Sequence, residues 1–275
     1  MHWSRQQTRL LLLISQADER LTLENDLRRA LQRDEFCLYY QPQISNTDRQ
    51  VMGVEALLRW QHPRKGILTP ETFIPLLEDT GLIVSVGEWV MSKACEQLRN
   101  WHAAGITVPQ VAVNIAPRQL VDENFTNKVQ QILADSRLEA SFLELEITES
   151  TLMENEELSI KTLRELHDMG VSIAMDDFGT GYSSLRYLRV FPLRTLKIDR
   201  AFVCNLPYNQ DDCNLASMII TMGHGMGLKV VAEGVETEAQ YSFLKGLDCD
   251  LTLGYFFSRP LPHDQIGDFL TSSPG

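Results

Sequence analysis

Hydrophobic residues along this chain recur at two spacings, one typical of helices and one typical of strands, and the two kinds of segment alternate. Helical spacing predicts helices over residues 24–32, 71–78, 86–104, 125–134, 156–169, 184–188, 215–226 and 237–247, with a last helix from Asp264. Short apolar runs predict strands over residues 36–43, 51–60, 111–115, 142–147, 171–176, 195–198, 229–233 and 250–253. Strands that alternate with helices form parallel sheets, so about eight strands in roughly 250 residues favour a (β/α)8 barrel over an open doubly wound sheet.

The start of the barrel departs from this pattern. Only the short segment 45–50 joins the first two strands, and it contains no helix. Parallel neighbours need a crossover of a dozen residues or more, so these two strands should be antiparallel. The fold class that we expect is α/β, an irregular TIM-type (β/α)8 barrel with the first strand antiparallel to the second.

The first residues differ from the rest of the chain. We expect residues 1–20 to be a linker helix or a remnant cut from a longer chain, and residues 21–275 to form the barrel domain. The early apolar run 10–14 is far too short to span a bilayer. Arg5 and Arg9 precede that run, but no small-residue cleavage site of a signal peptide follows it. We therefore expect no membrane insertion of this chain and a cytoplasmic location, which includes the cytoplasmic part of a membrane-associated protein.

The charge and the cysteine content of the chain limit the classes of ligand and partner that it can bind. The formal net charge is −12, from 37 acidic residues and 25 Lys plus Arg. Binding to DNA or RNA polymers needs a basic surface, so the charge argues against such partners but not against a small phosphorylated ligand. The five cysteines are widely scattered without a Cys-x-x-Cys pair, which is typical of reduced thiols and not of a zinc site.

Six predicted strands end at a residue that can bind a metal ion or a phosphate. These residues are Glu55, Asn114, Glu146, Asp176 with its neighbour Asp177, Lys197 and Glu233. The carboxyl ends of parallel strands meet at one face of a barrel, where barrel enzymes keep their chemistry. The Asp176-Asp177 pair alone could be a solvated turn or a helix N-cap, but six such strand ends favour a site. Strand parity places Glu55 with Arg59, Asp176 with Ala174, and Lys197 with Asp199 on inward faces.

The potential ligands are carboxylates and one amide, with no histidine. Oxygen donors of this kind favour Mg²⁺ or Mn²⁺ over zinc. Several carboxylates beside one basic residue are typical of two-metal sites, which act in phosphoryl transfer.

These residues lie in motifs that resemble the EAL-domain cyclic-di-GMP phosphodiesterases. The tripeptide Glu55-Ala56-Leu57 resembles the family signature, and the further motifs occur in the family's order. They are Tyr40-Gln41-Pro42, Asn114-Ile115, Glu146-Ile147-Thr148-Glu149, the segment from Asp176 to Ser184, Leu196-Lys197-Ile198-Asp199, Ala232-Glu233-Gly234-Val235-Glu236-Thr237, and Gly254-Tyr255 with Arg259-Pro260. The resemblance covers about residues 22–270.

The resemblance implies that two ions, Mg²⁺ or Mn²⁺, activate a water that hydrolyses cyclic di-GMP to linear pGpG and so ends a bacterial second-messenger signal. It assigns Glu55, Asn114, Glu146 and Asp176 to the first metal and Asp176, Asp177 and Glu233 to the second. Lys197 would orient the water or stabilise charge, which makes Lys197, Glu55, Asp176, Asp177 and Glu233 the catalytic set.

The remaining roles are also implied by the resemblance. Substrate binding falls to Gln41, Leu57, Arg59, Asn114, Asp199 and Glu236, with Asp199 also a partner of Lys197. Glu149 would anchor the loop after Asp177. Family members often form homodimers through the helix and loop after Asp177, and the N-terminal helix suggests an upstream sensor or diguanylate cyclase domain.

Two departures from the family pattern leave an alternative open. Leu253 stands where the family usually has Gln, so a polar contact is lost, and Ala116 replaces a usual Ser in a milder change. The alternative is a catalytically weakened domain that binds cyclic di-GMP as a sensor. A barrel enzyme acting on sugar phosphates is a more distant possibility.

Overall fold

The computed structural model describes residues 20–149, 151, 155–179 and 185–271. The chain divides into two compact units, one from Met1–Cys37 and Leu58–Val86 and one from Leu38–Leu57 and Gly87–Gly275. Among the described residues, no helix is both long and apolar enough to cross a membrane.

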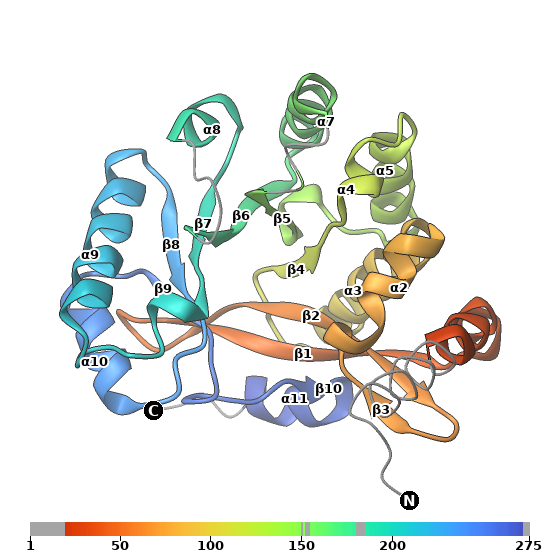
Figure 1. Cartoon of the computed structure of the whole chain (residues 1–275), viewed down its shortest axis with the longest axis horizontal. Coiled ribbons are helices and arrows are strands. Elements are labelled where there is room, and N and C mark those ends of the chain that lie inside the picture. Colours follow the sequence, from red (N-terminus) through yellow and green to blue (C-terminus); the bar gives the residue numbers. More distant parts are fainter. Residues whose placement is uncertain (1–19, 150, 152–154, 180–184, 272–275) are drawn as a thin grey trace, which may run out of the picture. The chain divides into compact units, whose positions relative to one another are not determined.

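The larger unit is built on a closed ring of strands (Figure 1). The ring order is β1-β9-β8-β7-β6-β5-β4-β2, and a β1–β2 pairing closes it. The strands are β1 (Phe36–Ser45), β2 (Val51–His62), β4 (Val111–Asn114), β5 (Leu143–Thr148), β6 (Ser172–Phe178), β7 (Thr195–Ile198), β8 (Lys229–Ala232) and β9 (Leu251–Thr252). This ring confirms the predicted (β/α)8 barrel.

Strand directions confirm the irregular start of the barrel. Along the ring, every pairing from β2 through β4, β5, β6, β7 and β8 to β9 is parallel, whereas β1 is antiparallel to β9. The first strand therefore runs against the second, and the Ser45 N–H closes the turn between them by donating to the Gln50 carbonyl at 2.9 Å. The short strand β10 (Leu261–Pro262) extends the sheet by pairing with β1.

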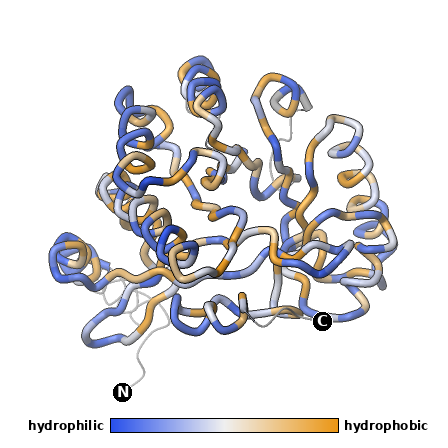
Figure 2. The backbone as a smooth tube through the Cα atoms, turned by 180° about the vertical axis from the view of Figure 1, so that it is seen from behind, coloured by the Kyte–Doolittle hydropathy of each residue, from blue (hydrophilic) through white to orange (hydrophobic). Residues whose placement is uncertain are grey.

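Helices cover the outside of the strands, as Figure 1 shows for α5, α7 and α9. The elements are α3 (Ile83–Ala103), α4 (Pro117–Leu120), α5 (Phe125–Ser136), η2 (Ala140–Phe142), α7 (Glu156–Met169), α8 (Leu185–Val190), η3 (Arg200–Phe202), α9 (Gln210–Gly225), α10 (Glu238–Gly246) and α11 (His263–Thr271). Hydrophobic and hydrophilic stretches alternate along these helices in Figure 2, as expected for helices that pack one face on the sheet.

Local signals explain where individual helices begin and end. The side chain of Asn155 caps α7 by accepting the Leu158 N–H, and Gly170 ends that helix with a left-handed φ of 102°. At α10, Thr237 and Gln240 form a reciprocal capping box. These caps fix the helices that separate the strands carrying the site.

The smaller unit contains the helix over residues 20–30, η1 (Leu31–Arg33), β3 (Gly66–Leu68) and α2 (Pro70–Thr80). Its centre is an aromatic cluster in which the Trp60 ring lies 6.2 Å from Phe36 and 5.8 Å from Phe73. The buried His62 imidazole lies 3.2 Å from Asp26 and ties the helix to the β2–β3 hairpin.

Several element boundaries differ from the predicted ones. The sequence analysis missed β3, β10 and α4, which are short segments without a clear hydrophobic period. Helix α9 begins at Gln210 rather than residue 215, because Asn209 caps it and the polar first turn carries no apolar signal. Strand β6 continues past Asp176 to Phe178, with a register shift between Met175 and Phe178.

Candidate active site

The centre of the site is the amine of Lys197, which four carboxylates surround inside the barrel. Its Nζ lies 2.6 Å from Glu233 Oε1, 2.7 Å from Glu146 Oε2, 3.2 Å from Asp176 Oδ2 and 3.5 Å from Glu55 Oε2. Lys197 is completely buried. The structure therefore brings five of the sequence-predicted residues into one cluster.

Strand register explains why these residues meet. Asn114 is level with Glu146, Thr148 with Asp176, and Lys197 with Val231 in the parallel ladder. Each group sits at the carboxyl end of its strand, and alternation along the strands turns it into the barrel. Residues separated by dozens of positions in the sequence thus converge because the sheet closes.

Burial and like charge dominate the electrostatics of this cluster. Burial raises the pKa of Glu233 to about 8, opposed by the Lys197 ammonium. Burial and the neighbouring Glu55 raise the pKa of Glu146 well above its usual value. Burial alone would lower the pKa of Lys197, but the surrounding carboxylates, Asp176 first, outweigh it and hold the pKa well above the usual value. Lys197 is therefore a permanent cation that offsets part of a large negative charge.

Asp176 and Asp177 occupy different positions, because a bulge separates them. Asp177 has a left-handed φ of 53°, a conformation that Asp tolerates better than most residues. Its N–H donates to Asp176 Oδ1 at 2.9 Å. Its half-buried carboxyl has a pKa raised to about 6 by burial and then by Asp176 and Asp199. The predicted strand ends at Asp176, whereas β6 runs on to Phe178 with this irregularity inside it.

The pairing of Asp199 with Lys197 stays a prediction. In the structure, the Asp199 side chain caps η3 by accepting the Ala201 N–H at 2.9 Å, and its charge raises the pKa of Asp177. Asp199 follows directly on β7, at the start of this 3₁₀ turn.

Glu144 is a buried acidic residue that the sequence analysis missed. It lies one layer below Glu146 on β5, and its Oε2 accepts from the Thr195 hydroxyl at 2.8 Å. Burial raises the pKa of this carboxyl above its usual value. Parity could have found it, because Glu144 and Glu146 are two positions apart on one strand and share the inward face.

The substrate-binding candidates lie in several places. Gln41 is buried in β1 and donates from Nε2 to the Ser258 carbonyl at 3.1 Å. Leu57 is partly buried in β2, and Arg59, in the smaller unit, donates to the Leu58 carbonyl at 2.8 Å. Asn114 donates from Nδ2 to Glu55 Oε1 at 2.8 Å. Glu236 pairs with Arg200 at 2.8 Å on the exposed surface.

Glu149 is the last residue that the structure describes before a gap at residue 150. Glu149 is buried just after β5. Its predicted anchoring of the loop after Asp177 falls largely on residues 180–184, which lie outside the described residues.

Leu253, which stands where the family usually has Gln, lies in an apolar cluster with Val231 and Leu251. All three face the barrel interior, since Val231 is level with Leu251 and with Lys197. Leu253 is 7% exposed.

The acidic cluster has the ligand chemistry of a metal site but not the spacing of one. Among the described residues, no three acidic, histidine or cysteine side chains are spaced to hold an ion, and four carboxylates close on Lys197 instead. The donor chemistry nevertheless fits a hard divalent cation, because all the candidates are oxygen ligands. In addition, Oε1 of Glu146 is buried with no hydrogen-bond donor in the described part of the chain.

A closed barrel that gathers acidic groups at the carboxyl ends of its strands has the arrangement of a barrel enzyme. The chain belongs to the EAL domain family, which matches residues 24–260.

Two curated relatives come from Pseudomonas aeruginosa. The chain is 46% identical to the bifunctional diguanylate cyclase/cyclic di-GMP phosphodiesterase MucR, over 91% of this chain and 36% of MucR. It is 45% identical to the cyclic di-GMP phosphodiesterase NbdA, over 94% of this chain and 33% of NbdA. The chain thus spans about a third of the length of these relatives.

Solved structures show the same fold. The PaMucR phosphodiesterase in complex with c-di-GMP has a TM-score of 0.86 at 46% identity, with 89% of this chain and 99% of that chain covered. The EAL enzyme Bd1971, in its cAMP and cyclic-di-GMP bound form, has a TM-score of 0.88 at 30% identity, with 97% and 73% covered.

Proposed function

We propose that this chain hydrolyses cyclic di-GMP to linear pGpG. The observation that carries the proposal is the ring of four carboxylates around the buried Lys197 inside the barrel. Relatives named as cyclic di-GMP phosphodiesterases, and one solved with c-di-GMP, support the substrate. In the reaction, an oxygen from water bonds to phosphorus, the bond from phosphorus to the 3′ oxygen breaks, and that oxygen takes up a proton.

The residues that would hold a metal pair are Glu55, Asn114, Glu146 and Asp176 for one ion and Asp176, Asp177 and Glu233 for the other. When bound, two divalent cations supply a strong nucleophile from water at neutral pH and offset the charge of the phosphodiester. The side chains would have to turn from Lys197 for this, and Asn114 would present its amide oxygen.

Lys197 has a different role in this scheme. Once the carboxylates engage cations, its ammonium is free to donate a hydrogen bond to the attacking water or to a phosphoryl oxygen. Because Lys197 keeps its proton, it acts by charge and orientation and not as a base.

The test is a product assay. The purified protein is incubated with cyclic di-GMP and Mg²⁺ or Mn²⁺, and pGpG is followed by chromatography, with a chelator as control. We expect cation-dependent pGpG, and loss of product with retained binding in Glu55→Ala. Binding without product would instead support the sensor alternative suggested by Leu253, and neither binding nor product would remove both.

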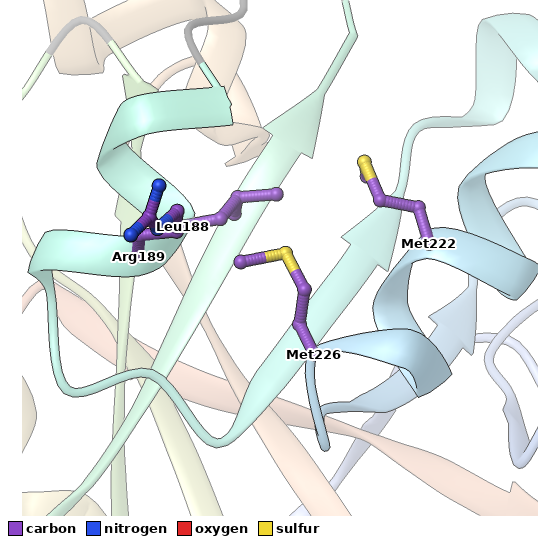
Figure 3. Close-up of a pocket in the computed structure, with 4 residues that line it drawn as sticks. All are labelled: Leu188, Arg189, Met222 and Met226. Carbon is purple, nitrogen blue, oxygen red and sulfur yellow. The ribbon is translucent and has the colours of Figure 1, made fainter.

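Pairing of two copies is part of the proposal. Helix α9 carries two exposed apolar residues, Leu215 and Met218, which are 40% and 66% exposed. Met222, further along α9, and Met226, just after its end, are partly buried. A pocket of about 550 Å³ between α8 and α9 is lined by Leu188, Arg189, Met222 and Met226 (Figure 3). Leu188 and Met226 point toward the same space in that view. These residues lie on α8, which is the described helix that follows Asp177, and on and just after α9. Together they form a surface that fits a homodimer interface.

Replacing Met218 by Asp is expected to shift such a dimer to monomer, because a charge would be buried in the apolar contact. Light scattering after size exclusion measures the change. Glu238→Asp, an exposed conservative change on α10, is the control. An unchanged mass for Met218→Asp would place the contact elsewhere.

We further propose that the chain works within a larger cytoplasmic or membrane-associated protein that carries a sensor or diguanylate cyclase domain. The short share of the curated relatives that it spans, and the bifunctional name of MucR, support this arrangement.

A further inference from the structure

A segment after β9 lies beside the site without an assigned role. It runs from Gly254 to Arg259, at the barrel end where Glu233 follows β8. A Cβ on Gly254 would lie 2.0 Å from the Val235 carbonyl oxygen, so the segment packs directly on the backbone between Glu233 and Glu236. The Phe256 N–H donates to the same carbonyl at 2.9 Å.

The other end of this segment is also fixed. Gln41 Nε2 donates to the Ser258 carbonyl at 3.1 Å, and Gln41 is 5% exposed. Arg259 therefore follows directly on a residue that β1 holds in place. Because both ends of the segment are anchored, its backbone is fixed at the mouth of the barrel. The positions from which its side chains extend are therefore fixed as well.

Two of those side chains form an exposed stacked pair. The Arg259 guanidinium carbon lies 4.4 Å from the centre of the Tyr255 ring, and Tyr255 is 44% exposed. No carboxylate among the described residues pairs with Arg259, whereas Arg200 is paired with Glu236. Elsewhere in the described part of the chain, Arg49 and Lys245 lie over the ring of Tyr241, which is buried.

This pair has the chemistry to recognise a guanine. Stacking on a ring leaves the N–H donors of a guanidinium available, and arginine has donors only. Guanine presents two acceptors, O6 and N7, on one edge, whereas adenine presents one acceptor and one donor there. A free guanidinium beside the site thus favours guanine over adenine.

Resting on the proposed function, we propose that Arg259, held by Tyr255, binds the O6 and N7 edge of one guanine of the substrate and sets base specificity. The ring of Tyr255 orients the guanidinium and offers an apolar face to the same base. Arg259 is thereby a specificity-determining residue, and Tyr255 is its positioning residue.

The test compares hydrolysis and binding of cyclic di-GMP and cyclic di-AMP by the whole chain. Arg259→Gln is expected to raise KM for cyclic di-GMP about tenfold, with kcat within about twofold, because a bidentate arginine–guanine contact typically discriminates by this much or more. Binding of cyclic di-AMP should be unchanged or improved, since Gln can both donate and accept. Tyr255→Ala should resemble Arg259→Gln, and Tyr255→Phe should resemble the wild type because it keeps the ring.

Arg164→Gln, which removes an exposed arginine of α7, is the matched control. Equal weakening of both dinucleotides by Arg259→Gln would overturn the proposal and make Arg259 a phosphate contact. Unchanged KM and discrimination would overturn it as well. If the wild type neither binds nor hydrolyses cyclic di-GMP, the proposed function fails first, which is distinguishable from failure of the subsite alone.

Discussion

Replacing Lys197 by methionine is expected to destabilise the fold by about 3–5 kcal/mol, the effect of removing one partner of a buried ion pair. Methionine has a similar length and apolar stem, so lost packing is small. The loss arises because Glu55, Glu146, Asp176 and Glu233 would face one another in the barrel interior without a cation. Thermal or urea unfolding followed by circular dichroism measures it.

The loss of stability caused by Lys197→Met should also depend on pH. In the folded protein the pKa of Glu233 is about 8, above the value of an unfolded chain, so unfolding releases a proton between these values and stability falls as pH rises. Protonated carboxyls need no cation, and the Lys197→Met loss should therefore be smaller at pH 5 than at pH 8. Added Mg²⁺ should recover part of the loss at pH 8.

The control for this experiment is Lys161→Met, which removes a lysine whose side chain is 72% exposed and lies 3.9 Å from Glu165 on α7. An exposed salt bridge of that kind contributes little to the free energy of unfolding. A Lys197→Met protein as stable as this control at pH 8 would contradict the view that Lys197 balances the acidic cluster.

Asp176→Asn is expected to lower kcat by about a thousandfold or more, equivalent to about 4 kcal/mol of transition-state stabilisation. Asn has the same shape and keeps an oxygen for the Asp177 N–H, which Asp176 accepts at 2.9 Å. What is lost is the charge that would bridge two cations. The pGpG assay at saturating cyclic di-GMP and Mn²⁺ measures kcat.

Asp135→Asn provides the matched control, because Asp135 is an exposed residue of α5 that accepts a hydrogen bond from Gln131. Cyclic di-GMP binding to Asp176→Asn should stay within about tenfold, which separates chemistry from binding. Retention of more than a tenth of wild-type kcat would argue against a bridging role for Asp176.

Much of this arrangement could be predicted from the sequence. The alternation of strands and helices gives the barrel, and the short turn before Val51 gives the antiparallel β1. Parity along β6 and β7 turned Asp176 and Lys197 inward, because a period of two leaves little freedom once a strand is placed.

The features of the site that cannot be predicted from the sequence depend on contacts between distant strands and on local turns. Nothing in the neighbourhood of Lys197 shows that it would pair with four carboxylates from β2, β5, β6 and the end of β8. The capping of η3 by Asp199 depends on the local turn that the chain makes directly after β7. The Tyr255–Arg259 pair follows from the fold of an irregular segment, for which no periodic pattern exists.

The antiparallel closure of the barrel also determines the order in which it can assemble. Strand β1 pairs with β9, and the Asn46 side chain accepts from Thr252 at 2.7 Å across 206 positions of sequence. A ribosome must therefore release nearly the whole barrel before its first strand finds this neighbour. Until then one edge of β1 lacks that partner, and contacts so far apart in the chain slow folding. We expect a nascent chain ending before β9 to depend on chaperones, whereas its parallel strands can pair in the order of synthesis.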